Sequence, residues 1–113
     1  MATARFIHDG DSIDYTPGGN VAAGDVVVQG DLVGIAKRDI AAGTLGALAV
    51  TGVFDVPKAT GSGSGIVVGA NVYWDEAEAV AKTDAEAGDN KPFGKTVKAA
   101  ADADTTVRVR VSQ

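Results

Sequence analysis

Short apolar runs recur along the chain at intervals of roughly ten residues, separated by Gly, Asp, Asn and Pro. This spacing is typical of a β-sandwich or β-barrel of short antiparallel strands. We expect strands at Arg5–His8, Ser12–Tyr15, Asp25–Gln29, Leu32–Ala36, Ala47–Val50, Val53–Val56, Val72–Trp74, Phe93–Lys98 and Thr106–Val111. The pattern predicts an all-β fold, and the length of 113 residues predicts a single domain over residues 1–113.

The segment from Val107 to Val111 alternates strictly between valine and arginine. Successive side chains of a strand point to opposite faces, so the valines should lie on one face, with Arg108 and Arg110 on the other. We interpret the segment as a half-buried strand with a solvated basic face. A dedicated anion site formed by the two arginines is the alternative.

Two segments with glycine are expected to be a turn and a loop. Gly30 and Asp31 separate two apolar runs, as the two-residue turn of a hairpin does. Thr60–Gly65 contains only Gly, Ser and Thr and predicts a flexible loop. Its amides could also cradle a phosphate, but a phosphate loop requires Lys and Ser or Thr after the last glycine, and Ile66–Val68 follows here. We therefore favour the plain loop.

The sequence leaves the structure of Asp75–Gly88 open. Its many Ala and Glu residues favour a helix, and Gly88 could cap that helix. Only Val80 is large and apolar, however, so a helix would lack the apolar stripe needed to dock on the core. We favour a hairpin that turns through Glu76 and returns around Ala79–Thr83.

The composition predicts a thin core. The chain has 15 Gly, its hydrophobic share is 45%, and its aromatic share is only 5%. Small apolar side chains bury little area each, and a domain of this size buries only about 60–65% of the surface of its unfolded chain. We therefore expect contacts between subunits to contribute to stability.

The charge balance argues against nucleic acid as a partner. The chain has 10 Lys and Arg against 15 Asp and Glu, a net charge of -5, so it lacks the basic footprint that grips a phosphate backbone. No apolar run reaches the roughly 18 residues of a membrane span, and the N-terminus does not resemble a signal peptide. The absence of Cys is compatible with a reducing cytosol.

Candidate catalytic and metal-binding groups are sparse in the sequence. With a single histidine, His8, no histidine metal set can form. Gly61–Gly65 has the letters of a nucleophile elbow but lacks the helix that should follow it. Asp9, Asp11 and Asp14 offer oxygens that suit Ca²⁺, but they do not fit a helix-flanked calcium loop, and we favour a solvated acidic turn. We expect no enzymatic activity, no metal and no cofactor.

A β-barrel carrier or small-ligand-binding module is the alternative class of function. The runs Val26–Val33 and Asp39–Thr44 look like those of barrels that present a group-carrying lysine or a small pocket. Such carriers place the lysine in a hairpin turn after Asp or Met, whereas Lys58 follows a proline. We therefore rank this alternative second.

Several motifs follow one another in a distinctive order. They are V-T-G-V-F-D-V-P-K-A at Val50–Ala59, G-A-N-V-Y-W-D at Gly69–Asp75, F-G-K-T-V at Phe93–Val97, and T-T-V-R-V-R-V at Thr105–Val111. In this order and spacing they resemble a family of small capsid decoration (cement) proteins of tailed bacteriophages and prophages. The resemblance covers nearly the whole chain, but departs after Asp75, where relatives usually carry a Thr-rich hairpin.

The resemblance implies a structural virion protein that binds the outside of the assembled capsid and stabilises it. Its partner would be the phage major capsid protein, without nucleic acid or membrane, and it would be made in the cytoplasm of the host bacterium. It would act as a homo-oligomer about a lattice axis, with a trimer favoured over a dimer.

Within this picture, residues 1–8 form an N-terminal arm that contacts the capsid or a neighbour. A terminal strand with unpaired backbone groups can add to another sheet edge, and we expect Arg5, Phe6 and Ile7 to lie in that interface. A strand paired within its own sheet is the alternative. Tyr73 and Trp74 should face opposite sides of their strand, one in the core and one at a surface, and we assign Trp74 to a subunit interface.

Overall fold

The computed structural model describes residues 3–112. Its strands are β1 (Ser12–Tyr15), β2 (Val26–Gln29), β3 (Leu32–Ala36), β4 (Gly46–Ala49), β5 (Gly52–Pro57), β6 (Asn71–Asp75), β7 (Val80–Lys82), β8 (Lys91–Thr96) and β9 (Thr106–Val111). A short 3-10 turn, η1 (Glu86–Gly88), precedes β8. Over the described range, no helix is long and apolar enough to cross a membrane. The all-β prediction is confirmed.

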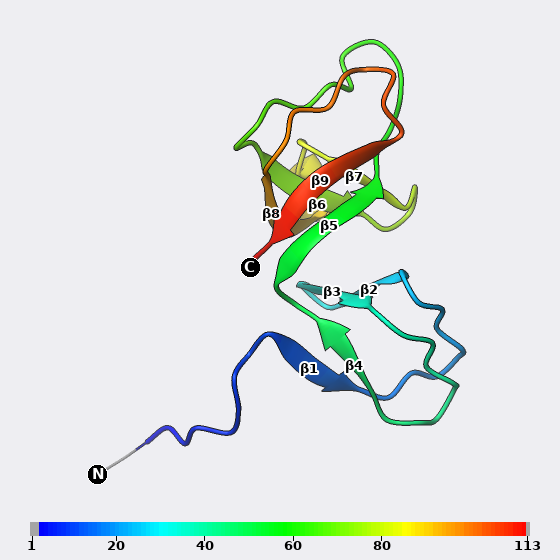
Figure 1. The fold of residues 1–113 in the computed structure, drawn as a ribbon, viewed down its shortest axis with the longest axis vertical. Helices are drawn as coiled ribbons and strands as arrows, with labels where there is room; N and C mark the ends of the chain where they lie inside the picture. Colours follow the sequence, from blue (N-terminus) through cyan, green and yellow to red (C-terminus); the bar gives the residue numbers. More distant parts are fainter. Residues whose placement is uncertain (1–2, 113) are drawn as a thin grey trace.

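The strands form two antiparallel sheets, one from each half of the chain (Figure 1). The N-terminal sheet has the order β1-β4-β3-β2, and the C-terminal sheet has the order β5-β9-β8-β6-β7. The chain passes from the N-terminal sheet to the C-terminal sheet between β4 and β5. In Figure 1 the C-terminal sheet lies above the N-terminal sheet. This sandwich-like arrangement agrees with the predicted fold class.

The C-terminal sheet curls so that its two edge strands, β5 and β7, come together. Lys58 directly follows β5 and forms a parallel bridge with Ala81 of β7, the strand at the opposite end of the sheet order. The sheet is therefore almost closed, like a small barrel. Closure leaves little unpaired backbone at its edges.

The alternation predicted for β9 is confirmed. Val107, Val109 and Val111 are 2%, 0% and 0% exposed, while Arg108 and Arg110 between them face outward. The valines stand inside the curl of the C-terminal sheet, where their burial is the main contribution of this strand to stability.

One core cluster joins the two sheets. Trp74 of β6 and Phe93 of β8 lie at its centre, with their ring centroids 5.7 Å apart at an interplanar angle of 50°. Val33 and Ile35 of β3 belong to the same cluster and bring one face of the N-terminal sheet against it. The sheets are thus held together by shared apolar burial.

A second, smaller cluster lies on the other face of β3. It contains Ala36, Ile40 and Leu48. Gly34 faces the same way, and a Cβ at this position would lie 2.8 Å from the Cβ of Leu48. Glycine therefore allows β3 and β4 to approach closely here.

Two predicted hairpins are confirmed. In the β2–β3 hairpin Gln29 lies opposite Leu32, and Gly30 takes a φ of 60°, as the first residue of a type II′ turn does. In the β6–β7 hairpin Asp75 lies opposite Val80, which confirms the favoured alternative for the Ala/Glu-rich stretch. The return strand is shorter than expected and ends at Lys82.

The strand expected at Arg5–His8 is wrong. These residues form no strand, and the first regular pairing joins Ser12 of β1 to Ala49 of β4. The segment before β1 runs away from the body of the molecule, so no sheet edge of its own chain lies within reach (Figure 1). The apolar pair Phe6 and Ile7 consequently has no core to pack against.

Candidate functional site

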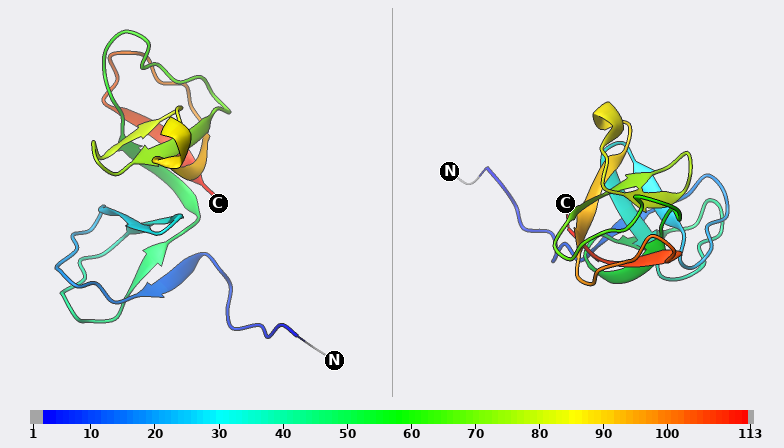
Figure 2. Two further views of the ribbon diagram at one scale, coloured as in Figure 1. Left: turned by 180° about the vertical axis from the view of Figure 1, so that it is seen from behind. Right: turned by 90° about the horizontal axis from the view of Figure 1, so that it is seen from above.

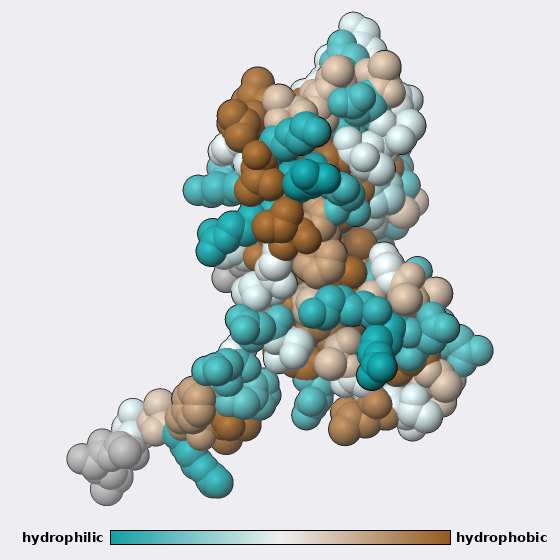
Figure 3. All heavy atoms as spheres, in the orientation of Figure 1, coloured by the Kyte–Doolittle hydropathy of each residue, from teal (hydrophilic) through white to brown (hydrophobic). Residues whose placement is uncertain are grey.

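We define the N-terminal arm as residues 3–11, the described segment before β1. Arg5, Phe6 and Ile7 are all exposed, with Phe6 79% and Ile7 72% accessible. Met1 and Ala2, the first two residues of the arm expected at residues 1–8, lie outside the described residues. Figure 3 shows the arm projecting from the body with apolar atoms on its surface. Large apolar side chains held away from their own core favour contact with another molecule.

Trp74, the other residue assigned to the interface, lies in the core. It is 4% exposed and packs against Phe93. Tyr73 points the opposite way, is half-buried, and lines a groove on the outside of the sheet. In the protomer, Trp74 therefore has almost no surface to offer a partner, and Tyr73 takes the outward position.

The outward side of β5, β9 and β8 presents an ordered array of side chains, which we call the outer face. The cross-strand pairing places Val53, Arg110 and Lys95 in one row and Asp55, Arg108 and Val97 in the next. The valines at the ends of these rows are 56% and 43% exposed. Figure 3 shows such apolar side chains interleaved with hydrophilic ones over the upper half of the molecule.

The two arginines of the outer face differ in their partners. Arg108 donates from Nε and Nη2 to the two carboxylate oxygens of Asp55, at 2.9 and 3.2 Å. This pair lowers the pKa of Asp55 and raises the pKa of Arg108. Arg110 lies opposite Lys95 on β8, and neither cation has an acidic partner among residues 3–112. An anion on this face would therefore be bound by Arg110 and Lys95.

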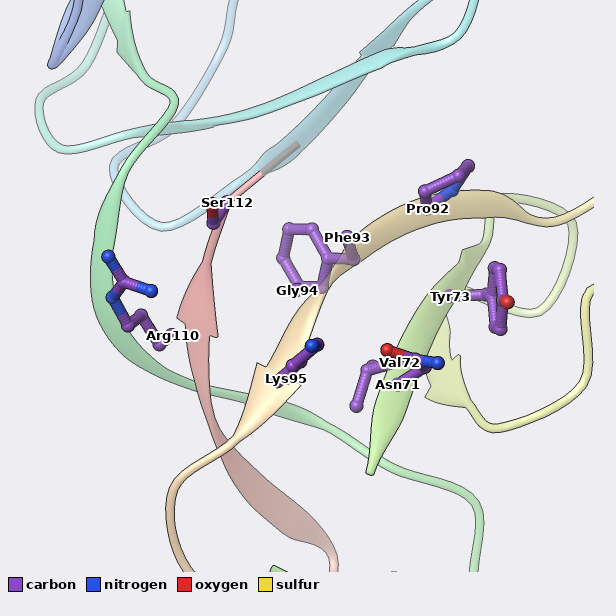
Figure 4. Close-up of a pocket in the computed structure, with 9 residues that line it drawn as sticks. All are labelled: Asn71, Val72, Tyr73, Pro92, Phe93, Gly94, Lys95, Arg110 and Ser112. Atoms are coloured by element: carbon purple, nitrogen blue, oxygen red, sulfur yellow. The ribbon is translucent and has the colours of Figure 1, made fainter. Parts of the chain in front are cut away.

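A groove of about 340 Å³ opens beside these two cations (Figure 4). Tyr73 and Pro92 give it apolar walls, and no Asp or Glu of the described residues lines it. A groove with apolar walls and two cations suits a group that is partly apolar and carries a carboxylate.

A cluster of carboxylates surrounds Lys82. Asp75, Glu78 and Glu86 bring oxygens within 4.8 Å of one another, as metal ligands do. The ammonium of Lys82 already pairs with all three, at 2.9 Å from Asp75 and 3.3 Å from Glu86. The hydrogen bond from Lys82 is the main cause that lowers the pKa of Asp75, to about 2. We interpret the cluster as a salt-bridge network centred on a lysine.

The acidic turn considered for calcium does not form such a cluster. Within the described part of the chain, Asp9, Asp11 and Asp14 are not among the carboxylates that converge. The side chain of Asp11 accepts a hydrogen bond from the hydroxyl of Thr51 at 3.3 Å. Among residues 3–112, these three carboxylates therefore do not converge as metal ligands do.

The Gly/Ser loop is anchored by Asp102. The amide of Gly65 donates to Oδ1 of Asp102 at 2.6 Å, and the amide of Gly61 donates to its carbonyl at 3.0 Å. A carboxylate of the chain itself therefore occupies an amide that a phosphate would need. These bonds also restrain the loop that the composition predicted to be flexible.

Lys58 is a buried lysine that the sequence reasoning missed. It is 4% exposed, and its ammonium donates to the carbonyls of Ala59, Asp102 and Asp104 at 2.8, 3.4 and 3.0 Å. The bonds to Asp102 and Asp104 tie the end of β5 to the turn before β9, and the bond to Ala59 uses the third hydrogen. A carrier protein needs an accessible lysine, which Lys58 is not.

One of three comparisons with known proteins identifies a family for the chain. No curated protein and no solved structure matches the chain. A scan against protein-family models finds a match, described as phage cement protein, over residues 7–111. The match begins within the arm, includes every strand from β1 to β9, and confirms the resemblance noted in the motifs. The chain therefore belongs to the phage cement protein family.

Proposed function

We propose that this protein binds the outside of the assembled phage capsid and stabilises the shell, with no enzymatic activity. The family match over residues 7–111 is the observation that carries the proposal. A shell that holds packaged DNA is under pressure, and a bound protein strengthens it by adding interface area across junctions between capsid subunits. The major capsid protein is thus the proposed partner.

The surfaces described above support this role. The arm carries exposed Phe6 and Ile7, and the outer face carries exposed Val53 and Val97 among charged side chains. Interfaces combine apolar contacts with a polar rim in this way. The net charge of -5 suits an outer position better than one against DNA.

We further propose that the protein acts as a homo-oligomer, as a trimer rather than a dimer. The core is small and consists largely of valines and one Trp–Phe pair. Because so small a core contributes little stability, contacts between subunits would stabilise the fold further. Arg5, Phe6 and Ile7 are the proposed contacts of the arm with its neighbour in the shell, either a capsid subunit or another copy.

Co-sedimentation with expanded capsids tests the proposal. The wild-type protein should pellet with the capsids at a fixed ratio to capsid subunits. Replacing Phe6 and Ile7 together by Ala should lower the bound fraction, whereas Leu45→Ala, which truncates another side chain that is 71% exposed, should not. Wild-type protein that stays in the supernatant at saturating concentration would overturn the proposal.

A further inference from the structure

We propose that the groove on the outer face binds the N-terminal arm of a second copy of this chain. The inference rests on the proposed function and deepens it, because it names the neighbour that the arm contacts. It rests on two surfaces, the groove and the arm. Both are partly apolar, and they carry opposite charges.

The groove offers two cations that have no acidic partner. Lys95 and Arg110 lie directly opposite each other on β8 and β9, and no acidic side chain among residues 3–112 pairs with either. Like charges that face each other across two strands destabilise a sheet. A carboxylate bound beside these cations would reduce that repulsion. Tyr73 and Pro92 supply apolar walls beside the two charges (Figure 4).

Exposed valines next to β8 are fixed in place by the backbone. Thr96 is buried, donates from its hydroxyl to the carbonyl of Val67 at 2.6 Å, and accepts the amide of Ala70 at 3.0 Å. Val67 and Val68 are consequently held 72% and 62% exposed. A surface that is already ordered loses little conformational entropy when a partner binds.

The arm offers the complementary groups. Phe6 and Ile7 form an apolar pair, and Asp9 follows two positions later. Within the described residues the carboxylate of Asp9 makes no hydrogen bond or ion pair, whereas that of Asp11 accepts from Thr51. Asp9 is therefore the carboxylate that we assign to the two cations, with Phe6 and Ile7 against the apolar walls and valines.

An arm that binds this groove comes from another copy of the chain. The arm runs away from the C-terminal sheet of its own chain, as Figures 1 and 2 show. The carbonyl of Asp11 accepts the amide of Val50 at 3.0 Å, so the free part of the arm begins at Gly10. Fully extended from there, Asp9 reaches about 7 Å and Phe6 about 17 Å beyond Asp11, so the neighbouring copy must lie directly beside β1. An acidic capsid segment could also neutralise the cations. The arm is favoured because it carries the apolar pair Phe6 and Ile7 two positions before the carboxylate of Asp9. Every copy of the chain also supplies such an arm.

Light scattering on the purified protein, without capsids, tests this inference. Wild-type protein should have a mass of at least twice the 11.3 kDa of one chain. Arg110→Glu and Asp9→Lys should each weaken self-association by about tenfold or more. The double variant with both changes should recover it, because the charges are exchanged. Arg38→Glu, at another exposed arginine, is the matched control and should leave the mass unchanged.

Three results would overturn the inference. The first is a wild-type mass of one chain at every concentration, and the second is an unchanged mass for Arg110→Glu. The third is a double variant that self-associates no more strongly than the two single variants. If Arg110→Glu abolishes capsid binding while the wild type is monomeric, the groove binds the capsid protein and the second-copy assignment is wrong. If self-association behaves as expected but no variant or wild type binds capsids, the inference holds and the proposed function fails.

Discussion

The ammonium of Lys82 lies 2.9 Å from the carboxylate of Asp75, whose side chain is only 7% exposed. Asp75 also accepts the amide of Glu78 at 3.1 Å, so its charged form is held by a cation and by a backbone donor. Both interactions lower the pKa of Asp75 from 3.8 to about 2, with the Lys82 hydrogen bond as the largest cause. Lys82 in turn has a raised pKa, caused first by Glu78 and then by Asp75.

This pair predicts an acid-sensitive contribution to folding. Because the pKa of Asp75 is lower in the folded chain, the stabilisation is complete above pH 3.8 and is lost as the pH falls toward 2. Asp75→Asn should therefore lower the melting temperature near neutral pH and flatten its decline between those two pH values. Asp89→Asn, at an exposed carboxylate, should keep the wild-type slope. If the melting temperature falls with pH equally steeply in wild type and in Asp75→Asn, Asp75 is not the source of the acid sensitivity.

Lys58→Met is expected to destabilise the fold. The substitution keeps the length of the side chain but leaves three carbonyls without their buried donor. The expected cost in the free energy of unfolding is about 2 kcal/mol, measured by chemical denaturation. Lys37→Met, at an exposed lysine, should change it by less than about 0.5 kcal/mol. Equal values for the two variants would show that the carbonyls do not depend on Lys58.

Gly94→Ala is expected to separate β8 from β9. A Cβ at Gly94 would lie 2.0 Å from the carbonyl oxygen of Arg110, and a backbone atom in a sheet cannot move aside as a flexible side chain can. The cost should be about 2 kcal/mol. Gly18→Ala, where a Cβ meets no atom within 4 Å, is the control. A Gly94→Ala protein that unfolds at the same denaturant concentration as the control would contradict the close approach.

The strands that could be predicted from the sequence are those whose pattern is local. The alternation around Arg108 and Arg110 places each residue on its face without knowledge of any neighbour, and Gly30 marks its turn by a backbone conformation that glycine adopts readily. The prediction failed at Arg5–His8 because an apolar pair becomes a strand only if a sheet edge is available to it.

The features that the sequence did not show depend on contacts between distant residues. The acceptors of Lys58 at Asp102 and Asp104 lie 44 and 46 positions away, so nothing near the lysine indicates that it is buried. The row that joins Val53, Arg110 and Lys95 likewise requires the register of β5 on β9 and of β8 on β9. The groove therefore depends on pairings between segments that are distant in the sequence.

The thermal stability of the shell tests the central claim most directly. Expanded capsids should be saturated with the protein, freed of the unbound fraction, and melted in a calorimeter beside bare capsids of the same preparation. We predict that the decorated shells melt at a higher temperature, by an amount that grows with the fraction of sites filled. Decorated shells that melt at the temperature of bare shells, with the protein demonstrably bound, would contradict a cementing role.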